Sequence, residues 1–180
     1  MLNANEFLGE LYSRLDALNP RYLSGQIAVD EFKNNELGKH FINQYKTFLP
    51  INKNAKILDI GVGEGWFASL CLNLGYQHIE MADFGCSEKF SKIQDSLREI
   101  VGVHDIETSI KNLLLQDEFI NKFDFIHLSH VIEHIPKYDL IDTMDSLNGA
   151  LKNQGELFLR APNMLGPTAL ASLYCTGGHE

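Results

Sequence analysis

The chain has 180 residues, of which 44% are hydrophobic and 22% are charged, and a formal net charge of −9 at pH 7. This length and composition favour one globular domain with a sizeable core. No apolar run reaches the roughly 18 residues that a membrane helix needs, and the negative charge disfavours nucleic acid, whose binding depends on clustered Lys and Arg.

The cysteines and the N-terminus indicate the compartment. Cys71, Cys86 and Cys175 are odd in number and lack C-x-x-C spacing, which disfavours a disulfide framework and a zinc ribbon. The first residues have neither a basic flank nor an apolar segment of signal-peptide length. We therefore expect a cytoplasmic protein with reduced thiols and with neither a membrane nor a nucleic acid as partner.

Two amphipathic helices are predicted ahead of the first strand. Apolar residues recur every three or four positions over residues 4–18, where Asn19-Pro20 ends the pattern, and again over residues 30–49. These helices are expected to form an outer layer or lid. Four aromatic residues of the second helix are predicted to belong to the core: Phe32, Phe41, Tyr45 and Phe48.

Strands and helices alternate from residue 56 onward. Strands are predicted at residues 56–60, 79–83, 100–103, 123–128 and 155–159. Helices are predicted at residues 66–74, before Gly75, and at 87–100, 110–120 and 140–151. This alternation is typical of an α/β fold with a doubly wound parallel sheet.

A glycine-rich turn follows the first strand. After Asp59 come Gly61, Gly63 and Gly65, and an apolar helical pattern begins at Trp66. Glycine permits positive φ and lets a ligand lie against bare backbone, while the start of a helix offers unpaired N–H groups. The turn therefore predicts a nucleotide-type ligand.

The details of the turn narrow the class of ligand. The dinucleotide motif G-x-G-x-x-G has its third glycine one residue later, at the position that Trp66 occupies here, and no P-loop Gly-Lys-Ser or Gly-Lys-Thr follows. No Lys or Arg lies between Lys56 and Lys89. The turn thus favours a cationic or neutral ligand over a polyphosphate.

Ligands of an open α/β sheet bind at the carboxyl ends of its strands. The residues predicted at those ends are Asp59 to Gly65, Asp83-Phe84, Asp105-Ile106, Ser129-His130 and Ala161-Pro162-Asn163.

Four segments together resemble a known family. They are Asp59-x-Gly61-x-Gly63-x-Gly65 with Asp83, the run from Phe123 to Pro136, the run from Leu151 to Leu157, and Ala161-Pro162-Asn163. In this order and spacing they resemble class I S-adenosylmethionine (SAM)-dependent methyltransferases of the small-molecule branch, over residues 40–165. The resemblance implies a Rossmann-like sheet of order 3-2-1-4-5. It also implies N-terminal cap helices (1–50), a SAM-binding core (51–165) and an irregular tail (166–180).

The resemblance also assigns roles around SAM and its product S-adenosylhomocysteine (SAH). The turn residues Gly61, Val62, Gly63, Glu64 and Gly65 would lie against the methionine and ribose parts. Asp59 would hold the methionyl ammonium, directly or through water, and Asp83 would accept hydrogen bonds from the ribose, with Phe84 against the adenine. Asp105 would take the adenine amine, with Ile106 beside it and Glu107 as a competitor. Ser129 and His130 would complete the cofactor site.

The implied reaction is in-line methyl transfer from a sulfonium to a small-molecule acceptor, such as a sugar or another polar metabolite. Proximity could supply much of the acceleration, and an oxygen acceptor would need a base. His130 is the first candidate, because histidine exchanges protons near neutral pH, with Glu133 and His134 one helical turn further on. A helix-capping role for His130 is an equal alternative.

Other functions compete with this interpretation. His130-x-x-Glu133-His134 matches the H-x-x-E-H zinc-peptidase pattern, but a strand precedes it and Pro136 follows, so no metal site is predicted. A SAM-binding but non-catalytic regulatory or scaffolding subunit, and a nicotinamide oxidoreductase, remain alternatives.

The end of the sheet departs from the family pattern. The resembled family adds an antiparallel hairpin after the fifth strand, and no further strand-like run follows residue 163 here. We therefore expect a shortened chain, or an edge covered by residues 164–180, by a second copy in a homodimer or by a partner chain.

Overall fold

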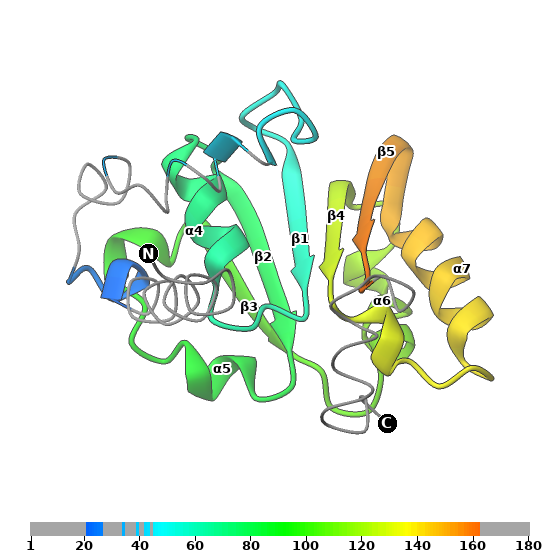
Figure 1. Cartoon of the computed structure of the whole chain (residues 1–180). Coiled ribbons are helices and arrows are strands. Elements are labelled where there is room, and N and C mark those ends of the chain that lie inside the picture. Colours follow the sequence, from blue (N-terminus) through cyan, green and yellow to red (C-terminus); the bar gives the residue numbers. More distant parts are fainter. Residues whose placement is uncertain (1–20, 27–33, 35–38, 40–41, 44, 163–180) are drawn as a thin grey trace, which may run out of the picture.

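The computed structural model describes residues 21–26, 34, 39, 42–43 and 45–162 (Figure 1). The predicted helix over residues 4–18 lies outside the described residues, as do much of the helix predicted over 30–49 and residues 163–180. None of the described helices is long and apolar enough to span a membrane.

Five parallel strands form one sheet in the order β3-β2-β1-β4-β5. Their bounds are β1 Lys56–Ile60, β2 His78–Asp83, β3 Val101–Asp105, β4 Phe123–Ser129 and β5 Leu151–Arg160. The central strands are apolar on both faces, as buried parallel strands are expected to be, since helices cover both sides. The α/β Rossmann-like fold and the order 3-2-1-4-5 are thereby confirmed.

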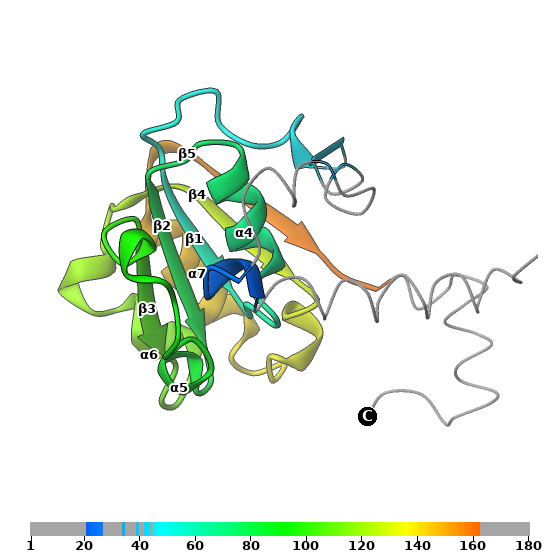
Figure 2. The ribbon, with the colours of Figure 1, turned by 90° about the vertical axis from the view of Figure 1, so that its left-hand side faces the viewer.

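Helices cover the two faces of the sheet (Figures 1 and 2). On one face, α4 (Trp66–Asn73) and α5 (Cys86–Lys89) cover a hydrophobic cluster that includes Ile57 of β1. On the other, α6 (Ile110–Leu114) and α7 (Leu140–Ala150) cover a second cluster that includes Leu58. Because alternate residues of a strand face opposite sides, β1 contributes to both clusters.

Residues 21–26, which no predicted element included, pack onto the first cluster. Residues 21–23 are helical, and Tyr22 and Leu23 are only 2% and 1% exposed. The Leu23 carbonyl accepts a hydrogen bond of 2.8 Å from the backbone N–H of Gln94. This contact ties the N-terminal segment to the loop after α5.

The long helix predicted over residues 87–100 is wrong. The chain forms only α5, followed by the 3-10 turn η1 (Asp95–Leu97). Phe90 and Ile93 still face the core, as their spacing required. Beyond Lys89 the backbone forms tighter turns, in which the N–H groups of Ser91 and Ile93 donate three residues back to Glu88 and Phe90, and the Gln94 N–H donates to Leu23.

Smaller corrections concern the bounds of other helices and strands. The helix predicted over 110–120 divides into α6 and the 3-10 turn η2 (Asp117–Phe119), and β3 continues to residue 105 instead of ending at 103. β5 begins at Leu151, with a register shift opposite Phe123/Phe125. In the predicted aromatic cluster Tyr45 is buried, whereas Phe48 is 51% exposed although its ring contacts that of Phe158; Phe32 and Phe41 lie outside the described residues.

Candidate functional site

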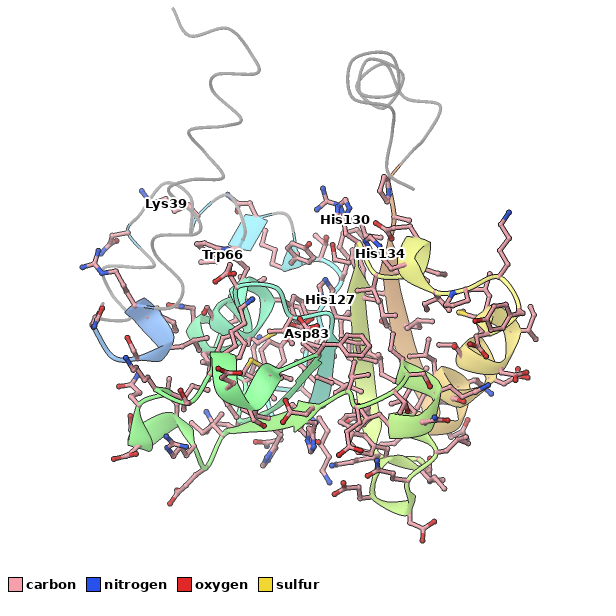
Figure 3. The ribbon with its side chains drawn as sticks, turned by 90° about the horizontal axis from the view of Figure 1, so that it is seen from below. Lys39, Trp66, Asp83, His127, His130 and His134 are labelled. Atoms are coloured by element: carbon pink, nitrogen blue, oxygen red, sulfur yellow. The ribbon has the colours of Figure 1, made fainter. Side chains whose placement is uncertain are left out.

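The glycine turn joins β1 to α4 at the carboxyl edge of the sheet, which faces the viewer in Figure 3. Gly61, Gly63 and Gly65 have φ values of 73°, 53° and 79°. A Cβ on Gly61 would lie 2.2 Å from Val131 Cγ2, whereas a Cβ on Gly63 would have no described residue within 4 Å. Gly61 therefore serves close packing, while Gly63 leaves the backbone of the turn bare for a ligand.

Asp83, at the end of β2, lies beside this turn. Its Oδ2 accepts a hydrogen bond from the Gly63 N–H at 3.2 Å, and its Oδ1 accepts one from the Phe84 N–H at 2.8 Å. The Phe84 side chain is 63% exposed. The structure thus brings a carboxylate and an exposed aromatic ring to the turn.

Asp105 ends β3 directly opposite Asp83 in the strand register. Hydrogen bonds from the Ser87 side chain and from the Ser87 backbone, the latter at 2.8 Å, hold the pKa of Asp105 below its ordinary value. Ile106 is 4% exposed and packs into the second hydrophobic cluster. Glu107, the predicted competitor of Asp105, is exposed.

A buried hydrogen-bonding contact joins Asp59 of β1 to His127 of β4. The two residues face each other in the register of the sheet, and Asp59 Oδ1 lies 2.7 Å from His127 Nδ1. Their side chains are 2% and 5% exposed. Asp59 Oδ2 and His127 Nε2 are buried without a hydrogen-bond partner among the residues that the structure describes. Buried polar atoms are normally paired, so each of these two can accommodate a further partner.

Aromatic rings enclose His127. Its ring stacks on Phe67 of α4 at a centroid distance of 3.8 Å and an interplanar angle of 8°. Tyr45 approaches edge-on at 5.6 Å, and Phe158 of β5 stacks at 5.5 Å. His127 is thus a packed, hydrogen-bonded core residue, and only the register of the sheet reveals that its partner is Asp59.

The candidate bases follow β4. His130 has a left-handed backbone, with φ of 58°, and its N–H donates to the Arg160 carbonyl at 2.9 Å. His130 Nδ1 lies 3.5 Å from Glu133 Oε1, and the His130 side chain is 52% exposed. His134 ends the 3-10 turn η3 (Ile132–His134). Figure 3 shows His130 and His134 near one another, on the β5 side of His127 and Asp83.

This geometry differs from a zinc-peptidase motif. That motif needs one α-helix to present both histidines on one face. Here His130 lies before a single 3-10 turn. Among the described residues, no group of three or more His, Cys, Asp or Glu side chains is placed to hold a metal ion.

The remaining predicted contacts lie around the turn. Val62 is buried in the first cluster, and Ser129 is half-buried at the end of β4. Glu64 Oε1 lies 3.0 Å from Lys89 Nζ of α5. This ion pair was not predicted, and only the proximity of α5 to the turn could have indicated it.

Comparison with known proteins identifies the family of this arrangement. A model of the methyltransferase domain matches residues 34–172. The curated proteins contain no significant match.

Solved structures show the same fold. A SAM-dependent methyltransferase from Archaeoglobus fulgidus is 21% identical, with a TM-score of 0.59, over 84% of this chain and 64% of that one. A SAM-dependent methyltransferase from Mesorhizobium loti is 16% identical, with a TM-score of 0.52, over 65% of this chain and 50% of that one. The chain therefore spans only 50% to 64% of the length of these two structures. Since the family model covers most of the sequence, the chain belongs to the methyltransferase domain family.

Proposed function

We propose that the chain binds SAM at the carboxyl edge of its sheet and transfers the methyl group to a small-molecule acceptor. The observation that carries the proposal is the glycine turn, with three positive-φ glycines and the Asp83 carboxylate hydrogen-bonded to Gly63. The family model supports the reaction class, since it describes a methyltransferase domain.

The side chains at this edge suit SAM. Asp59, Asp83 and Asp105 offer hydrogen-bond acceptors, and no donor in the described part of the chain meets the buried Oδ2 of Asp59. An ammonium group, ribose hydroxyls and an adenine amine are donors that match them, and such charge-assisted hydrogen bonds are about twice as strong as neutral ones. A pyrophosphate would instead meet repulsion from three carboxylates.

When bound, SAM supplies an electrophilic methyl group on a sulfonium and leaves as SAH. Asp59 would hold the ammonium end, the glycine turn and Asp83 the ribose, and Phe84 with Asp105 the adenine. Holding the acceptor in line with the methyl group supplies most of the rate acceleration through proximity and orientation, so little acid–base catalysis is needed. His130 would take the proton of an oxygen acceptor, with Glu133 orienting its ring.

The acceptor is proposed to be a small polar molecule, and residues 1–50 to form a cap over it. The net charge of −9 opposes a nucleic acid acceptor. Residues 21–26 already lie on the face of the sheet that α4 covers, so the chain before β1 reaches the side of the glycine turn.

Calorimetry with SAH and NADH tests the cofactor assignment. SAH should bind and NADH should not. Asp83→Asn should lower the affinity for SAH by about tenfold, which corresponds to the loss of one charge-assisted hydrogen bond. Comparing the SAH affinities of Asp105→Asn and Glu107→Gln shows which of the two acids binds the adenine amine. Binding of NADH in preference to SAH would overturn the proposal.

Turnover separates an enzyme from a cofactor-binding subunit. The full chain is incubated with SAM and a library of small acceptors, and products are sought as a mass gain of one methyl group. His130→Gln should lower kcat and shift the pH profile of turnover. Persistent absence of methylated product from a SAH-binding protein would favour the regulatory or scaffolding alternative.

A further inference from the structure

A cavity of about 230 Å³ lies between residues 21–26 and the region of α5, next to the glycine turn. Its basic lining residues are Arg21, Lys89 and Lys92, and its only acid among the described residues is Glu64. Its apolar lining comes from Leu23, Phe90 and Ile93, which are 1%, 7% and 5% exposed. The cavity thus combines an apolar floor with cationic walls.

The two walls are fixed to each other. The Leu23 carbonyl accepts from the Gln94 N–H at 2.8 Å, which joins the two walls, and within the first wall the Arg21 carbonyl accepts from the Gln26 N–H at 2.7 Å. A Cβ on Gly65 would lie 2.7 Å from Leu23 Cδ1 and 2.9 Å from Phe90 Cε1, so both walls meet at the end of the turn. The cavity is therefore held in place by core packing, not by surface side chains alone.

The charges in the cavity are unbalanced. Glu64 lies 3.0 Å from Lys89, which leaves two cations, Arg21 and Lys92, without an acidic partner among the described residues. This local excess of positive charge occurs in a chain with 24 acidic and 15 basic residues. Clefts lined by one sign of charge concentrate ligands of the opposite sign.

We propose that this cavity binds a small organic acid, with its apolar body on Leu23, Phe90 and Ile93 and its carboxylate or phosphate between Arg21 and Lys92. The cavity is smaller than the roughly 300–1,000 Å³ of pockets for drug-sized ligands, which limits the body to about one ring or a short chain. Because Glu64 belongs to both the cavity and the turn, the acid is either the methyl acceptor or a regulator of cofactor binding. Only the acceptor role rests on the proposed function.

Calorimetry of the full chain with phenylacetate, phenyl phosphate and phenylacetamide tests the site. The two acids should bind and the neutral amide should not, with affinity falling as salt rises. Lys92→Gln and Arg21→Gln should each weaken the acids by about fivefold or more, while the exposed control Lys137→Gln should change nothing. Equal binding of acid and amide, no binding of either acid, or full binding by both cavity variants would overturn the proposal.

SAH binding by the same variants keeps the two proposals distinct. Retained SAH affinity in Lys92→Gln with weakened acid binding supports a separate anion site, whereas equal loss of both ligands overturns it. If the chain binds the acids but not SAH, the proposed function is contradicted and the acid-binding site is supported. With SAM present, a methylated acid and an equal amount of SAH identify the acceptor. An unchanged acid that alters SAH affinity identifies a regulator.

Discussion

The buried contact between Asp59 and His127 gives the sharpest prediction. His127→Phe keeps a ring of similar size on Phe67, so it preserves the stacking at 3.8 Å while removing the nitrogen that faces Asp59. Because Asp59 Oδ2 already lacks a partner within the described ranges, the substitution leaves both carboxylate oxygens of this side chain, which is 2% exposed, without one there. The change therefore isolates the cost of an unpaired buried acid.

Removing one partner of a buried pair costs about 3–5 kcal/mol of unfolding free energy. For a chain of this length, each 1 kcal/mol lowers Tm by about 2–4 °C, so we expect a fall of roughly 6–20 °C. Urea unfolding of the ligand-free protein, followed by circular dichroism, measures the free energy, and a thermal scan measures Tm.

The double variant Asp59→Leu/His127→Phe is the matched control. It replaces both polar groups by apolar ones, which for buried pairs is often neutral, so most of the lost stability should return. A cost below about 1 kcal/mol for the single variant, or equal costs for the single and double variants, would refute the reasoning.

Three further predictions concern other parts of the fold. Gly61→Ala should cost about 1–3 kcal/mol more unfolding free energy than Gly63→Ala, because only the first adds a clash to the left-handed backbone; equal costs in urea melts would argue against this. Burial raises the pKa of Glu80, but hydrogen bonds from His104 and Lys122 outweigh it and lower the pKa below its ordinary value. The lowered pKa of Glu80 stabilises the folded protein at pH values above the unfolded pKa of about 4.3. This stabilisation is lost as the pH falls through the pKa of Glu80 in the folded protein. Stability should therefore drop on acidification below about pH 5, less steeply in Glu80→Gln than in the exposed control Glu99→Gln; parallel pH profiles would contradict this. Burial raises the pKa of Cys86 to about 12 and that of Cys71 well above its ordinary value, so maleimide at pH 8 should label neither until the protein unfolds, as read by peptide mass spectrometry; labelling of either in the native protein would exclude such burial.

The sheet could be predicted because its signals are local. Runs such as Phe123 to Leu128 are nearly continuously apolar, and the glycine turn begins directly after Ile60, where β1 ends. Parallel connections then leave few topologies, so the strand ends, and with them Asp83 and Asp105, fall at one edge. Local pattern and overall topology agree at these positions.

The misplaced elements depend on contacts between distant segments. The spacing of Phe90 and Ile93 fits a helix, but the chain turns after Lys89 and the Gln94 N–H donates to Leu23, a contact that is not visible in the local pattern. The pairing of Asp59 with His127 requires the register between β1 and β4. The cavity beside Glu64 also could not be predicted from local patterns, because three separate segments form it.

The separation of Asp59 and His127 also has a consequence for folding during synthesis. The pair joins residues 68 positions apart, so at about 5–20 residues per second the ribosome needs roughly 3–14 s to deliver the second partner after the first. Until then, one side of β1 is an open edge that carries an acid. Charged residues on open edges discourage pairing with other chains. The carboxylate that the finished protein buries would thus protect the nascent sheet from aggregation until β4 arrives.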